Sequence, residues 1–95
     1  MTLVAAIALS GCDNVAGEGR NRGVETFGSV QSLSHEDGSL TKDGWREVRI
    51  RCLETARNWN DGAQDQEKFY NACVSSAGQE EEQQVALFRD ADRRT

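Results

Sequence analysis

Two cysteines, Cys52 and Cys73, lie on either side of a strong turn signal, and their placement limits the folds open to this chain. Asn60-Asp61-Gly62 lies between them and favours the end of a helix, because glycine readily takes the left-handed conformation that closes one. Cys52 precedes Gly62 by ten residues, and Cys73 follows it by eleven. In an antiparallel pair of helices that turns at this glycine, the two side chains would face each other. The sequence therefore predicts a helical hairpin closed by a disulfide.

Apolar periodicity supports a helix before the turn and one after it. The segment at about 42–59 follows Thr41, a suitable N-cap. Its apolar residues fall within a stripe of roughly 80° at 100° per residue, namely Trp45, Val48, Cys52, Ala56 and Trp59. The segment at about 64–77 has its own stripe, which consists of Phe69, Tyr70, Cys73, Val74 and Ala77. We expect the tryptophans to fill the core of this hairpin.

A third helix is predicted at about 79–92, after Gly78. It opens on Glu80-Glu81-Glu82 and is followed by Arg93-Arg94, and this order of charge suits the helix dipole. The predicted fold class is therefore all-α, with a small helical domain over residues 42–95.

The N-terminus has the features of an export signal. Residues 3–9 are an uninterrupted apolar run, and Leu9-Ser10-Gly11-Cys12 follows it directly. The run is too short for a membrane-spanning helix, which needs about 20 residues, and suits the apolar region of a signal peptide. The tetrapeptide resembles the lipobox of bacterial lipoproteins, although Met1-Thr2 lack the usual basic residue. The resemblance implies that residues 1–11 are a signal peptide and that Cys12 is lipidated.

Residues 12–41 are rich in glycine and polar side chains. Four apolar residues between Val24 and Leu33 recur at every third position, which fits neither a helix nor a strand well. We therefore expect a flexible, lipid-anchored tether with at most one short element at 24–33. Asp13 directly follows the lipobox and resembles an inner-membrane retention signal of enteric lipoproteins. The predicted location is the cell envelope, facing the periplasm or the exterior, with the inner membrane favoured.

Lipidation of Cys12 would leave an even pair of cysteines, as a disulfide requires. Closing a loop of this length would stabilise the fold by about 3 kcal/mol on the chain-entropy account. If the chain is not exported, the two cysteines are instead buried thiols. A zinc site needs about four ligands, whereas the mature chain offers two thiols and one histidine.

Composition and motifs disfavour several functional classes. The net charge of −5 disfavours nucleic-acid binding, which normally requires a basic excess. No cofactor-binding, metal-binding or catalytic motif stands out, so we expect no cofactor and no enzymatic activity. His35, in Ser34-His35-Glu36-Asp37, is the only histidine and would be the base of a remote alternative, an envelope hydrolase.

One polarised surface emerges from the helical periodicity. Residues 42–60 carry a net charge of +2, and their basic side chains flank the apolar stripe with an apolar residue among them. The candidate partner-binding residues are Arg46, Arg49, Leu53 and Arg57. The alternative interpretation is that these arginines cover the edge of the hairpin and pair with Glu47 or Glu54.

These features predict a non-enzymatic envelope lipoprotein that binds another envelope protein, in an exclusion, inhibition or assembly role. In size, lipobox and helical character the chain is similar to plasmid entry-exclusion lipoproteins, although its cysteine spacing is longer. The second hypothesis is a structural or scaffolding lipoprotein that associates with itself through the third helix.

Overall fold

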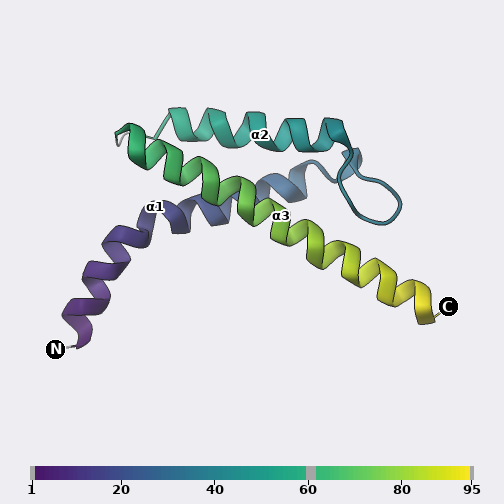
Figure 1. Cartoon of the computed structure of the whole chain (residues 1–95), viewed down its shortest axis with the longest axis horizontal. Coiled ribbons are helices and arrows are strands. Elements are labelled where there is room, and N and C mark those ends of the chain that lie inside the picture. The colour runs from purple at the N-terminus through teal and green to yellow at the C-terminus, as the bar shows by residue number, and fades with distance from the viewer. Residues whose placement is uncertain (1, 60–61, 95) are drawn as a thin grey trace.

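The computed structural model describes residues 2–59 and 62–94, with side chains from residue 14 onward. It contains three α-helices and one 3-10 turn: α1 Thr2–Ser29, η1 Gln31–Leu33, α2 Lys42–Arg57 and α3 Ala63–Arg94. Figure 1 shows α2 beside α3, while the second half of α1 crosses α3 on its other side. The described ranges contain no strand, only an isolated antiparallel bridge between Ser34 and Leu40. The predicted all-α fold is confirmed.

The disulfide-closed hairpin is also confirmed. Cys52 of α2 and Cys73 of α3 are bonded, with their Cα atoms 5.8 Å apart and both side chains fully buried. Helix α2 begins where predicted, because the Thr41 hydroxyl accepts a hydrogen bond from the Gly44 N–H at 3.1 Å. It ends at Arg57, where Asn58 N–H donates to the Glu54 and Thr55 carbonyls. Asn60 and Asp61 of the predicted stop lie outside the described residues.

The two helices predicted at 64–77 and 79–92 are instead one continuous helix, α3. Gly78 continues the helix, so the prediction of a stop there was wrong. A single glycine costs a helix only about 1 kcal/mol relative to alanine, and strong helix formers follow it through residue 84. Gly78 also lies beside Trp45, whose ring would be 3.8 Å from a Cβ at this position. Packing across the hairpin therefore favours an unbroken helix.

The flexible tether predicted for residues 12–41 was likewise wrong. Residues 14–29 are helical, and Val15 and Phe27 are buried in the core. Val30 and Leu40, on either side of η1, are buried as well, with exposed fractions of 1% and 6%. The third helix packed on the hairpin is therefore α1. The backbone of residues 2–11, part of the predicted signal, forms the first turns of α1. Lipidation of Cys12 stays a prediction.

Two glycines explain why the glycine-rich segment packs against α3. A Cβ at Gly19 would lie 2.7 Å from the Phe69 carbonyl oxygen, and one at Gly23 would lie 2.7 Å from the Ser76 Cβ. Such distances leave no room for a side chain, so these two glycines allow the backbones of α1 and α3 to approach closely. The Ser76 hydroxyl then donates a hydrogen bond of 2.8 Å to the Arg20 carbonyl across the interface.

We predict that Gly23→Ala destabilises the protein by about 1–3 kcal/mol, because the added methyl group overpacks the α1–α3 interface. The matched control is Gly28→Ala, since nothing lies within 4 Å of a Cβ at Gly28. That variant should be unchanged or slightly more stable. Urea unfolding, followed by circular dichroism with the disulfide intact, measures both. Equal effects of the two substitutions would contradict the close approach.

Candidate partner-binding groove

Four of the five basic residues of α2 form one exposed stripe. Lys42, Arg46, Arg49 and Arg57 are spaced by three, four or eight residues, which places them on one face of the helix. Val48, Cys52 and Ala56 occupy the adjacent, buried face. The sequence-based placement of these arginines beside the buried stripe therefore agrees with the structure.

The first half of this stripe borders an open groove of about 710 Å³. Three cations of α2 line it, together with side chains of the loop at residues 34–40. We call it the basic groove, and its lining residues are His35, Leu40, Lys42, Asp43, Trp45, Arg46 and Arg49. The buried Leu40 and the half-buried Trp45 also line the groove, and Trp45 supplies the larger part of their apolar surface. The groove thus combines excess positive charge with an apolar contact area.

The loop that forms one wall of the basic groove is tightly hydrogen-bonded. His35 N–H donates to the Ser39 carbonyl at 2.7 Å, and Gly38 N–H donates to the His35 carbonyl at 3.0 Å. Gly38 has a φ of 92°, a conformation that strongly favours glycine. Asp37 Oδ1 accepts from the Ser39 hydroxyl at 2.6 Å and from the Ser39 N–H. These two bonds, with the charges of His35 and Arg89, hold the pKa of Asp37 below its usual value.

Glu81 of α3 forms hydrogen bonds with two residues that line the groove. Its carboxylate oxygen Oε2 accepts a hydrogen bond from the Leu40 N–H at 2.8 Å and another from the Trp45 indole N–H at 3.1 Å. Hydrogen bonds to an ionised acceptor are stronger than neutral ones. Glu81 therefore joins the loop, α2 and α3 at one point. In the sequence, Glu81 is recognisable only as part of an acidic helix start, because the position of the loop depends on the tertiary fold.

The groove cations form no ion pairs with carboxylates in the described part of the chain. Within residues 14–59 and 62–94, no ion pair involves Lys42, Arg46 or Arg49. Glu47 pairs with Arg51 at 3.6 Å, and no ion pair among the described residues joins Arg46, Arg49 or Arg57 to Glu47 or Glu54. The pairing expected in the alternative interpretation was therefore wrong, whereas the covering of the hairpin edge by these arginines stays a prediction. Asp43 is the one acidic side chain in the groove lining. The groove therefore keeps an excess of exposed positive charge.

Leu53 and Arg57, the other two candidate residues, lie outside the basic groove. They border a separate hollow of about 310 Å³ near the turn between α2 and α3. There Gln66 donates a hydrogen bond to the Trp59 carbonyl at 3.3 Å. The structure thus brings together Arg46 and Arg49 and adds Lys42 and His35 to them, whereas Leu53 and Arg57 belong to a different surface.

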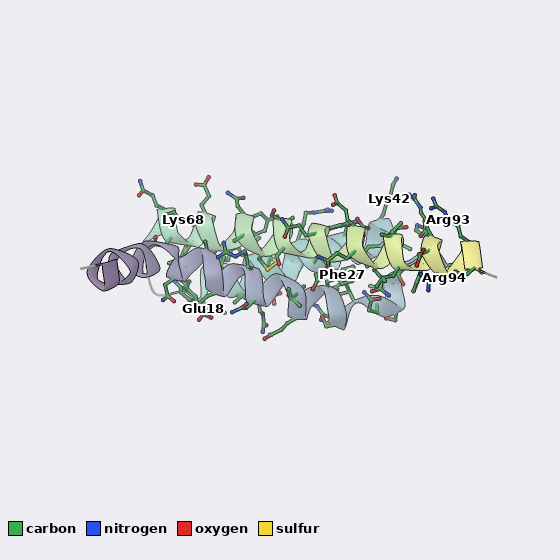
Figure 2. The ribbon with its side chains drawn as sticks, turned by 90° about the horizontal axis from the view of Figure 1, so that it is seen from below. Glu18, Phe27, Lys42, Lys68, Arg93 and Arg94 are labelled. Carbon is green, nitrogen blue, oxygen red and sulfur yellow. A yellow bond between two sulfur atoms is a disulfide. The ribbon has the colours of Figure 1, made fainter. Side chains whose placement is uncertain are left out.

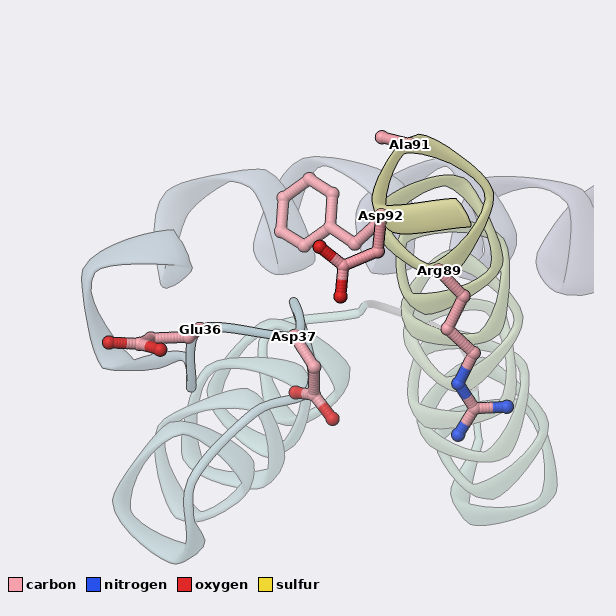
Figure 3. A pocket seen from close by; sticks show the side chains of 6 residues that line it. Glu36, Asp37, Arg89, Ala91 and Asp92 are labelled. Atoms are coloured by element: carbon pink, nitrogen blue, oxygen red, sulfur yellow. The ribbon is translucent and has the colours of Figure 1, made fainter. Parts of the chain in front are cut away.

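A third hollow, of about 530 Å³, lies between the loop and α3 and has the opposite character. Figure 3 shows Asp92 extending from α3 toward the loop, while Glu36 points away from the helix. With Asp37 these residues give three carboxylates against one cation, Arg89. An anionic ligand would therefore favour the basic groove over this hollow.

His35 is exposed at the basic groove, and the neighbouring Ser34 hydroxyl donates to the Gln31 carbonyl at 2.6 Å.

The described side chains contain no group of three or more residues suited to hold a metal ion. Among the described helices, none is both long and apolar enough to span a bilayer. Scans of protein-family models, of curated proteins and of solved structures found no match to this chain.

We predict that Glu81→Ala destabilises the protein by about 1–3 kcal/mol, because the Leu40 and Trp45 N–H groups lose their acceptor in a half-buried place. Glu82→Ala, at the exposed neighbouring position, is the control and should change stability by less than about 0.5 kcal/mol. Urea unfolding followed by tryptophan fluorescence reports both values. A Glu81 variant as stable as the control would show that these bonds do not hold the groove.

Proposed function

We propose that this protein is a small lipoprotein of a bacterial cell envelope, anchored through Cys12, that uses the basic groove to bind an acidic segment of another envelope protein. The observation that carries the proposal is the set of three cations, Lys42, Arg46 and Arg49, which no described carboxylate pairs with and which surround Leu40 and Trp45. Arginine and tryptophan are both enriched at the energetic centres of interfaces.

The charge distribution supports a partner that binds in one orientation. The whole chain carries −5, so most of its surface repels an anionic segment while the basic groove attracts one. Such an arrangement raises association rates and fixes the register of a complex. It also makes binding sensitive to salt, since exposed charges are screened over about 8–10 Å at physiological ionic strength.

The arrangement of the helices supports a groove that faces away from the anchoring membrane. Figure 2 places Lys42 in the half of the molecule that lies away from the first turns of α1, along a longest dimension of 52 Å. Val15 is buried in the core only three residues after Cys12. A lipid on Cys12 would therefore hold the helical body close to the bilayer and direct the basic groove toward proteins in the compartment beyond.

Site-specific photo-cross-linking in cells tests the groove. A photoreactive residue at Asp43 should give a discrete adduct, and mass spectrometry should place the cross-link in an acidic segment of the partner. Arg46→Glu with Arg49→Glu should reduce this adduct at least about tenfold, because two attractive charges become repulsive. The control, Arg57→Glu with Lys68→Glu, makes the same change of charge outside the groove. Equal loss in both variants, or an adduct that lacks acidic residues, would contradict the proposal.

Metabolic labelling with a fatty acid tests the anchor in the same cells. The wild-type protein should incorporate the label and fractionate with membranes, since two or more acyl chains hold a protein stably on a bilayer. Cys12→Ser should be unlabelled and should retain residues 1–11. Unlabelled wild-type protein with Met1 still present would refute lipidation and leave the groove experiment valid.

A further inference from the structure

The last turns of α3 extend beyond the body formed by the three helices, as the yellow end of Figure 1 shows. We call residues 80–94 the C-terminal arm; its first turn still contacts the loop and α2 through Glu81, and its later turns project. Leu87 is 63% exposed, more than any other large apolar side chain with a described position. Phe88, on the neighbouring face, packs against the backbone of the loop at Gly38. The contact with the loop therefore accounts for an apolar side chain at position 88, whereas no contact within one chain covers most of Leu87.

The face of the arm that carries Leu87 has an ordered pattern of charge. Glu80 and Arg94 each lie seven residues from Leu87, a spacing that returns to almost the same face of a helix after two turns. Ala91 lies one turn after Leu87 on this face. The face therefore starts on an acidic residue, is apolar at its centre and ends on Arg94, which forms an ion pair of 3.1 Å with Asp90 of the same helix.

We infer that the C-terminal arm pairs with the arm of a second copy of this chain, in antiparallel orientation, with Leu87 at the two-fold axis. In this arrangement Glu80 of each copy lies opposite Arg94 of the other, since both are the same distance from the axis. A parallel pair would instead place like charges together. A two-fold interface requires a self-complementary surface, and this face meets that requirement through one leucine and two opposite charges.

The proposed pairing uses a surface separate from the basic groove. Leu87 and Arg94 belong to the projecting end of α3, whereas the groove lies between α2 and the loop. Two copies joined by their arms would therefore present two basic grooves. Failure of the arm proposal would leave the groove proposal standing, and the reverse also holds.

Sedimentation equilibrium of the full-length protein in detergent tests the pairing. The wild type should form a dimer, and Leu87→Gln should raise the dissociation constant about tenfold or more, because both copies lose apolar surface at the axis. Val24→Gln removes an exposed valine of α1 (46% exposed) and should leave association unchanged. Circular dichroism should show that both variants remain folded.

A charge exchange tests the antiparallel orientation. Glu80→Arg alone and Arg94→Glu alone should each weaken the dimer by about three- to tenfold, since each converts two attractions into repulsions. The double variant, Glu80→Arg with Arg94→Glu, should restore wild-type association. A monomeric wild type, a dimer insensitive to Leu87→Gln, or a double variant weaker than either single variant would overturn the inference.

Discussion

The close approach of α1 to α3 at Gly19 and Gly23 is the contact on which the rest of the molecule depends. A hairpin of α2 and α3 alone would leave the α1-facing side of α3 in water. The two glycines remove the side chains that would hold α1 away, and the Ser76–Arg20 hydrogen bond joins the two helices at that point. Once α1 is seated, Phe27 and Val30 complete the core, and the chain enters the loop from a fixed position.

That fixed entry determines the shape of the basic groove. The loop leaves η1 and returns to α2 at Thr41, whose N–H and hydroxyl both donate to the Leu33 carbonyl. Glu81 then holds Leu40 and Trp45 from the side of α3. Lys42, Arg46 and Arg49 thus line a groove whose shape depends on three segments, the loop, α2 and α3. Because no ion pair among the described residues involves Lys42, Arg46 or Arg49, the groove retains its positive charge for an external ligand.

The sequence predicts those features that depend on residues close together in the chain, and it does not predict those that depend on contacts between distant segments. Cys52 and Cys73 could be paired because both were counted from the same turn, and the arginines could be placed because helical periodicity fixes their face. Gly19 and Gly23 were misread, since glycine accompanies both flexible chain and close helix packing. Only the surface opposite a glycine decides between the two, and residues 69–76 lie some fifty positions away. Glu81 was missed for the same reason, because its donors belong to a loop and to another helix.

Amide hydrogen exchange tests the central claim, that α1 is an integral part of the packed fold, most directly. In the full-length, disulfide-bonded protein, the amides of residues 19–27 should be protected to a degree comparable with residues 69–77, because the two segments cover each other and open together. Exchange of residues 19–27 at the rate of an unstructured chain, with residues 69–77 still protected, would contradict the account. That result would restore α1 to the role of a tether on an independent hairpin.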